Sequence, residues 1–152
     1  MKNIVFVCTG NVCRSAAAEF VMKKILADKG VTDIKVSSVG TEDLHNSPRD
    51  PEMIRIAAEN DYEIGGTSRY MNVKELEQAD LILVMADCHL EILESVLDFQ
   101  YWDRIHLFMH YCLGKNETLM DPHFQMEAVY SYVFRTIEAG CKGLAEKLLL
   151  EY

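Results

Sequence analysis

The feature that most constrains the fold of this chain is a short apolar strand that runs directly into a glycine-containing turn and then into a helix. Asn3–Val7 (NIVFV) is a β-branched and aromatic run, typical of a strand covered on both faces. The polar turn CTGNVCRS follows at once, and Ala16–Gly30 carries apolar residues at helical spacing with a terminal glycine as stop signal. Strand, tight turn and helix in this order open a βαβ unit.

The same alternation continues along the chain. Three more strands are predicted, at Ile34–Ser38, Leu81–Met85 and Ile105–Phe108. Further helices are predicted at residues 52–60, with Pro51 in the first turn, and at 73–78, 88–97 and 126–150. The sequence therefore predicts one α/β domain over residues 1–152, a four-stranded parallel sheet flanked by helices on both faces.

Composition excludes several classes of protein. With 49% apolar residues the chain is expected to fold, and its net charge of −9 disfavours nucleic acid and anionic membranes as partners. No apolar stretch approaches the roughly 18–20 residues of a membrane span, and no secretory leader is recognised. The five cysteines are odd in number and form no CxxC pair. We therefore expect free thiols in the cytoplasm, with no metal and no cofactor.

The loop after the first strand is where chemistry is expected, because ligands of parallel sheets lie beyond the carboxyl ends of the strands. If Cys8–Ser15 wraps into a cradle, its N–H groups and the positive end of the next helix make an anion site for a tetrahedral phosphate. Gly10 and Asn11 tolerate the left-handed backbone that such a cradle needs. Arg14 offers a planar fork to two phosphate oxygens.

A thiol at the centre of this cradle faces the same positive potential. The thiolate form of Cys8 should be favoured, and Ser15 could donate its hydroxyl to the sulfur or cap the helix. The sulfur would attack phosphorus in line and give a cysteinyl-phosphate that water then cleaves. The position of this CxxxxxR pattern between a strand and a helix favours that interpretation over a buried structural cysteine.

The segment VCTGNVCRS resembles the signature of the low-molecular-weight protein tyrosine phosphatases, and the resemblance extends to SSVGTEDLHNSPRDP, ADLILVM and IEAGCKGL. It implies that Cys8 is the nucleophile, Arg14 the phosphate clamp, Asn11 a support of the loop and Ser15 the hydrogen-bond donor to the thiolate. Thr9, Gly10, Val12 and Cys13 complete the implied phosphate-binding loop. The implied partner is a phosphorylated protein or peptide, and we expect a monomer, with weak self-association left open.

Asp121, followed by Pro122, matches the general acid of that family, which protonates a leaving phenolate and then activates water. His123 and Phe124 follow, where the family usually has aromatic residues as one wall of a slot for the phosphotyrosine ring. Leu44 matches the opposing wall, often Trp in relatives. For each wall residue an ordinary loop role stays open.

Two positions depart from the family pattern. A histidine that many members carry is absent, with Gly66 near its place, and Ala86 stands where an Asp often follows the third strand. These positions usually brace the cradle. Cys13, beside Cys8, could form a reversible disulfide that protects the nucleophile, or could be a packed side chain.

Three alternatives remain. A phosphoarginine phosphatase shares the fold, but that subgroup resembles CTGNTCRS, with Thr where this chain has Val12. An arsenate reductase needs two relay cysteines, and only Cys88 lies in the relevant region. A module that binds phosphate without turnover is disfavoured by the intact Cys8, Arg14 and Asp121.

Overall fold

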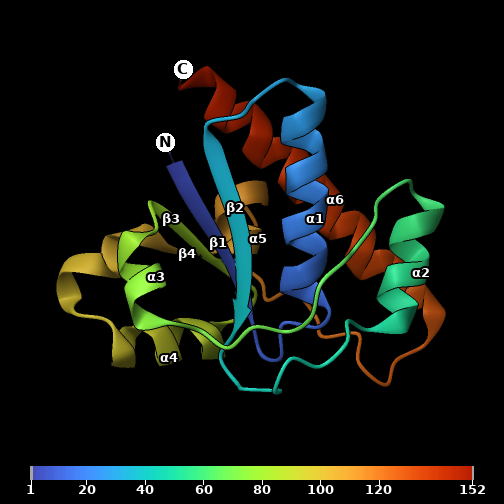
Figure 1. Ribbon diagram of the computed structural model, residues 1–152, viewed down its shortest axis with the longest axis horizontal. Helices are drawn as coiled ribbons and strands as arrows, with labels where there is room; N and C mark the ends of the chain where they lie inside the picture. The colour runs from blue at the N-terminus through green and yellow to red at the C-terminus, as the bar shows by residue number, and fades with distance from the viewer. Residues whose placement is uncertain (1, 152) are drawn as a thin grey trace.

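Four parallel strands form one sheet in the computed structural model, which describes residues 2–151 (Figure 1). The strands are β1 (Lys2–Cys8), β2 (Ile34–Gly40), β3 (Leu81–Val84) and β4 (Ile105–Leu107). The helices are α1 (Arg14–Asp28), α2 (Pro51–Glu59), α3 (Val73–Gln78), α4 (Asp87–Val96), α5 (Phe108–Leu113) and α6 (Glu127–Leu150), with a 3-10 helix, η1, at Phe99–Arg104.

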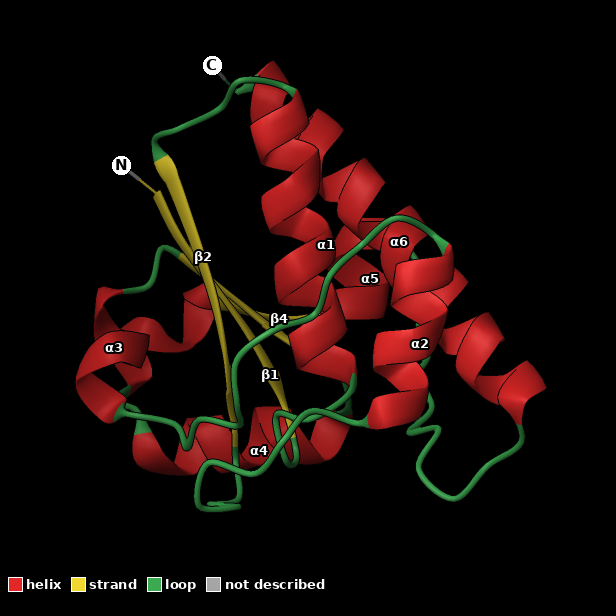
Figure 2. Ribbon diagram, turned by 45° about the vertical axis from the view of Figure 1, so that its right-hand side comes forward, coloured by secondary structure: helices red, strands yellow, loops and turns green. Residues whose placement is uncertain are grey.

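Alternate side chains of the strands enter two separate apolar layers. Along β1, Ile4 and Phe6 belong to the larger layer under α1, α5 and α6, whereas Val5 and Val7 belong to the layer under α3 and α4. Figure 2 shows these two groups of helices on opposite sides of the strands. The predicted sheet with helices on both faces is confirmed.

The strand order is β2-β1-β3-β4, so the chain leaves β1 in one direction and later returns to its other side. This creates a topological switch point at the carboxyl end of β1, where ligands bind in open parallel sheets. The loop that the sequence singled out begins there. In Figure 1 it lies at the lower end of the sheet, close to the loops that follow β2 and precede α6.

The structure differs from the prediction on both sides of β4, within residues 99–113. The predicted strand over Ile105–Phe108 ends at Leu107, because Phe108 begins α5, and neither η1 nor α5 was foreseen. Phe108 is fully buried and packs edge-on against Phe6, with ring centroids 6.1 Å apart. A Cβ at Gly140 of α6 would lie 2.4 Å from the Phe108 ring, so a glycine is required for this close approach.

Candidate active site

The loop between β1 and α1 is a cradle whose carbonyl groups point outward. They accept hydrogen bonds from the neighbouring loop: Cys8 from the Thr41 N–H at 3.0 Å, Thr9 from Glu42 at 2.9 Å and Val12 from Asp50 at 2.9 Å. Within residues 2–151, the N–H groups of residues 10–13 donate to no protein acceptor. Four amides and the N-terminal end of α1 are therefore available to an anion, as the sequence leads us to expect.

Two backbone positions make this shape possible. Asn11 has a φ of 57°, in the left-handed region that asparagine tolerates better than most residues. Gly40, at the end of β2, lies directly against the cradle, and a Cβ there would be 2.7 Å from the Thr9 carbonyl oxygen. Any larger residue at position 40 would push the loop away from the sheet.

The sulfur of Cys8 shares a hydrogen bond with the Ser15 hydroxyl. The Cys8 Sγ lies 2.9 Å from Ser15 Oγ, and both residues are buried. The Asn11 Nδ2 group donates to the same Ser15 oxygen at 2.9 Å. Because that amide nitrogen can only donate, the Ser15 hydroxyl accepts from it and its own proton remains available for the sulfur. This geometry supports the donor role expected of Ser15.

A buried polar cluster stands behind the cradle. Asn11 Nδ2 also donates to Ser38 Oγ at 2.8 Å, and Ser38 donates to Glu19 Oε1 at 2.5 Å. The Asn11 Oδ1 atom accepts from the Arg69 backbone N–H at 2.8 Å and from Arg49 Nη1 at 2.9 Å. Sequence reasoning did not assign roles to Glu19, Ser38 or Arg49. One available signal was a polar Ser37-Ser38 pair inside an otherwise apolar strand.

Arg14 connects the cradle to the loop that carries the candidate acid. The Arg14 side chain is buried, its Nη1 donates to the Leu119 carbonyl at 2.9 Å, and its Nη2 lies 3.7 Å from Asp121 Oδ2. Leu119 N–H in turn donates to the Met85 carbonyl, at the end of β3, at 3.1 Å. Asp121 is therefore held at the mouth of the cradle, with its side chain 52% exposed.

A pocket of about 250 Å³ opens above the thiol. Its lining brings together most of the predicted site residues: Cys8, Thr9, Gly10, Val12, Cys13, Arg14, Glu42, Leu44, Asp121 and His123. The side chains of Asn11 and Ser15 lie behind it, fully buried.

Phe124, expected as a possible wall, does not line this pocket. It borders an adjacent groove and is 92% exposed, and its ring contacts His123 with centroids 3.9 Å apart and planes tilted by 45°. Its backbone φ of 63° is rare for an aromatic residue. Leu44 and His123 are thus the two predicted wall residues that reach the pocket.

Comparison with known proteins places this geometry in a family. The model of the family "Low molecular weight phosphotyrosine protein phosphatase" matches residues 3–151. The chain belongs to this family. The protein-arginine-phosphatase of Bacillus subtilis (strain 168) is 29% identical over 96% of both proteins. The low molecular weight protein-tyrosine-phosphatase Wzb of Escherichia coli (strain K12) is 29% identical and covers 99% of this chain and 97% of its own length.

The likeness extends to the fold. A protein tyrosine phosphatase from Entamoeba histolytica, whose crystal structure has Hepes in the active site, is 28% identical, has a TM-score of 0.91, and covers 99% of both chains. The family and the fold predicted from the sequence are confirmed.

A histidine that the sequence left unassigned supports the cradle of this phosphatase-family chain. His89 is fully buried, its Nδ1 accepts from the Ala86 N–H at 3.1 Å, and its Nε2 lies 2.8 Å from Thr9 Oγ1. Since Nδ1 accepts, the proton of the neutral ring is on Nε2 and is donated to Thr9. Burial, reinforced by the charge of Arg14, lowers the pKa of His89 to about 4, so the ring is neutral at neutral pH.

Cys13 lines the pocket as a thiol. Burial, followed by the charge of Asp50, raises the pKa of Cys13 well above its usual range. All five cysteines are unpaired in the structure. The predicted disulfide between Cys13 and Cys8 therefore remains a hypothesis about an oxidised state.

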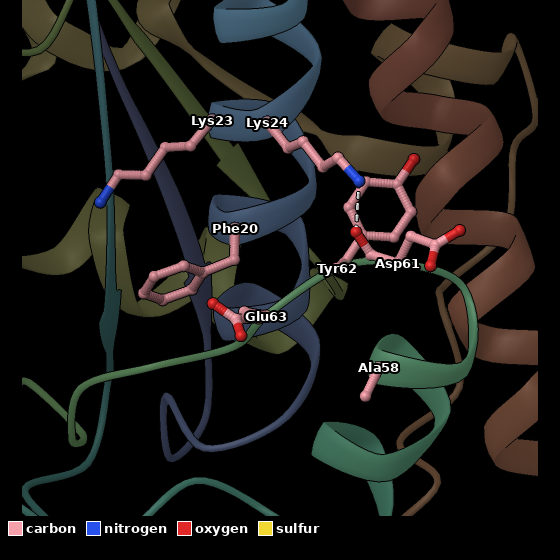
Figure 3. Close-up of a pocket in the computed structure, with 7 residues that line it drawn as sticks. All are labelled: Phe20, Lys23, Lys24, Ala58, Asp61, Tyr62 and Glu63. Atoms are coloured by element: carbon pink, nitrogen blue, oxygen red, sulfur yellow. Dashed lines mark hydrogen bonds between the residues drawn. The ribbon is translucent and has the colours of Figure 1, made fainter.

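A second hollow lies between α1 and the chain that follows α2 (Figure 3). It is lined by Phe20, Lys23, Lys24, Ala58, Asp61, Tyr62 and Glu63. Lys24 donates to the Asp61 carbonyl and Lys23 pairs with Glu19, so both ammonium groups already have partners. Its lining has no thiol and no arginine, so it lacks the chemistry of the Cys8 pocket.

Residues 2–151 contain neither a cluster suited to a metal ion nor a helix suited to a membrane. No group of three or more His, Cys, Asp or Glu side chains there could hold a metal ion. None of the helices in that range combines the length and the apolar character needed to cross a bilayer.

Proposed function

We propose that this chain hydrolyses phosphotyrosine monoesters in proteins or peptides, with Cys8 as the nucleophile. The observation that carries the proposal is the convergence of Cys8, Arg14 and Asp121 on one pocket, with Ser15 Oγ 2.9 Å from the sulfur. Membership of the phosphotyrosine phosphatase family supports the same reaction.

In the first step the Cys8 thiolate attacks phosphorus, and a P–S bond forms as the P–O bond to the phenol breaks. The equatorial oxygens are stabilised by the inward amides of residues 10–13 and by the Arg14 guanidinium. Asp121 gives its proton to the departing phenolate oxygen, which makes tyrosine the first product.

In the second step water attacks phosphorus and the P–S bond breaks. Asp121, now a carboxylate, accepts a proton from that water, and inorganic phosphate leaves. The sulfur departs as a thiolate, which the Ser15 hydroxyl and the positive end of α1 stabilise. The cycle thus returns every residue to its starting state.

We also propose a phosphorylated protein or peptide as the partner and the cytoplasm as the compartment. The family description supports a phosphoprotein substrate. Five unpaired thiols, including the exposed Cys88, are consistent with a reducing environment.

The decisive test replaces the sulfur. Cys8→Ser should abolish turnover of a phosphotyrosine peptide, measured as phosphate release with a metal chelator present, and acid quenching of the wild type should trap phosphate on the Cys8 peptide. Cys88→Ser, at an exposed thiol outside the pocket, should keep full activity. Unchanged turnover by Cys8→Ser would refute the proposal.

Phosphoarginine is the second candidate substrate, and one observation favours it. The pocket contains two carboxylates, Glu42 and Asp121, which could pair with a guanidinium leaving group. Val12 also lines the pocket and offers no hydroxyl. Turnover of phosphotyrosine and phosphoarginine peptides should be compared for the wild type and for Val12→Thr. Higher wild-type activity on phosphoarginine would reverse the order of the two candidates.

A further inference from the structure

A second guanidinium lies beneath the cradle, on the side away from the pocket mouth. Arg49 is only 5% exposed, although the loop that carries it lies at the surface. Its Nη1 donates to both the backbone carbonyl and the Oδ1 of Asn11, the latter at 2.9 Å, and its Nε donates to the Gly65 carbonyl at 3.0 Å. One side chain therefore joins the left-handed residue of the cradle to the segment that precedes α3.

A glycine in the left-handed conformation lies beside the Arg49 guanidinium. Gly66 has a φ of +73°, and a Cβ built there would lie 3.5 Å from Arg49 Nη2. A side chain at position 66 would therefore contact the guanidinium directly. Position 66 is near the place where the sequence lacks the histidine of the family pattern.

Arg49 places a buried positive charge behind the cradle. Burial lowers the pKa of Arg49, while the negative charges of Glu19 and of the Cys8 thiolate act in the opposite direction. The charged groups that face Arg49, Cys8 and the adjoining Cys13 come from several elements: Glu19, Arg69, Arg14, Asp50 and Asp121. Arg14 lies on the pocket side, so Arg49 supplies positive charge from behind the loop.

We propose that Arg49 is a positioning residue for the reaction, which holds Asn11 in its left-handed conformation and favours the anionic form of Cys8 by its buried charge. This inference rests on the proposed function, because it concerns the same thiol. It goes beyond that function in assigning part of the reactivity of Cys8 to a residue that does not touch the phosphoryl group.

The experiment compares Arg49→Gln, which removes the charge, with Arg49→Lys, which keeps the charge but cannot reproduce three directed bonds. Arg55→Gln is the matched control, because this arginine of α2 is exposed and pairs with Glu52, Glu59 and Glu127 at the surface. Two quantities are measured: kcat and KM on an aryl phosphate, and the pH at which iodoacetamide alkylation of Cys8 is half-maximal. Peptide mass spectrometry separates Cys8 from the exposed Cys88.

Arg49→Gln should lower kcat/KM by about tenfold to a hundredfold and raise the alkylation midpoint by about one pH unit. Arg49→Lys should keep the midpoint near that of the wild type but lose part of kcat, because Asn11 is less firmly held. Arg55→Gln should change neither quantity.

Two results would overturn the inference. One is an alkylation midpoint for Arg49→Gln equal to that of Arg55→Gln, which would leave Arg49 a structural brace without influence on the thiol. The other is an Arg49→Lys protein with wild-type kcat, which would remove the positioning role.

If Arg49→Gln fails to fold, Arg49→Lys still decides the positioning role, since full kcat refutes it and reduced kcat with an unchanged midpoint supports it. Alkylation needs no substrate, so a chain that hydrolyses nothing but still shows these shifts would contradict the proposed function alone.

Discussion

The two sides of the phosphate cradle differ sharply in how they are held. The inner side comprises Asn11, Ser15, Glu19, Ser38 and Arg49, all of them at most 6% exposed and joined by hydrogen bonds. The outer side, residues 119–126, is attached to the cradle chiefly through Leu119 and has exposed side chains at Met120, Phe124 and Met126.

This difference separates two tasks of the proposed reaction. Stabilising a thiolate and a phosphoryl group requires dipoles that do not reorganise, and buried, mutually bonded groups meet that need. Delivering a proton to a protein-sized leaving group requires access, which an exposed loop with few buried contacts provides. We therefore expect substitutions on the inner side to lower stability, and to affect catalysis through the geometry of the cradle, whereas those on the outer side should change catalysis with little effect on stability.

The largest expected effect is on the outer side. Asp121→Asn should lower kcat on a phosphotyrosine peptide by about 10²- to 10⁴-fold, because no group then protonates the phenolate. The melting temperature should stay unchanged, since the Asp121 side chain is 52% exposed. Steady-state kinetics on aryl phosphates of decreasing leaving-group basicity check this, and the loss should shrink along the series. An equal loss for every leaving group would argue against the acid role.

The inner side should show the opposite pattern. Asn11→Ala removes a buried amide with partners in Ser15, Ser38, Arg49 and Arg69, and should lower the free energy of unfolding by about 2–4 kcal/mol. Urea denaturation measures this. Asn116→Ala, at an exposed position, is the control and should stay within about 0.5 kcal/mol of the wild type. If the two variants lowered the free energy of unfolding by similar amounts, the inner and outer sides of the cradle would not differ in the way described above.

His89 adds a pH dependence to the buried side of the cradle. Its pKa is lowered from 6.5 to about 4 in the folded chain, so the unfolded chain binds the extra proton as the pH falls through that interval. The stability contributed by neutral His89 is present above this window and lost below it. The control is His89→Gln, which keeps a hydrogen-bond donor for Thr9. When the pH is lowered from about 7 to about 5, the free energy of unfolding of the wild type should fall by about 2 kcal/mol more than that of His89→Gln. Parallel pH curves for the two proteins would exclude this role.

The smallest effect is expected at Phe124. Phe124→Ala removes an almost fully exposed ring beside the pocket, so unfolding should change by less than about 0.5 kcal/mol. KM for a phosphotyrosine peptide should rise about twofold to tenfold, whereas KM for a small aryl phosphate should not, because the ring lies outside the Cys8 pocket. Steady-state kinetics with both substrates provide the measurement. A rise in KM for the small substrate would place the ring closer to the phosphate than the structure does.

Local patterns were sufficient to predict most of the fold. NIVFV and LILVM are strands because β-branched and apolar runs of that length fit a sheet covered on both faces, and Gly30 follows α1 in a left-handed conformation, with a φ of 71°. The strand over residues 105–107 was predicted, but η1 and α5 on either side of it were not. Phe108 suits a buried helix start as well as the end of a strand, and its place depends on the contact with Gly140 of α6, far away in the sequence.

The same distinction applies to the site. Cys8, Arg14 and Ser15 were singled out because their spacing, in a loop between a predicted strand and a predicted helix, suggests a cradle. Arg49 and His89 were missed, because polar residues in loops and on helices are usually exposed, and only their tertiary partners show that they are buried. Residues that support a site from other elements leave little trace in a single sequence.

The bond from Arg14 to the Leu119 carbonyl has a consequence for how mutant data should be interpreted. Replacing this arginine would remove the proposed phosphate ligand and would also release the segment that carries Asp121 from the cradle. A lower kcat in such a variant would have two separate causes, which are poorer charge stabilisation and a displaced proton donor. Only a double-mutant cycle with Asp121 could separate them.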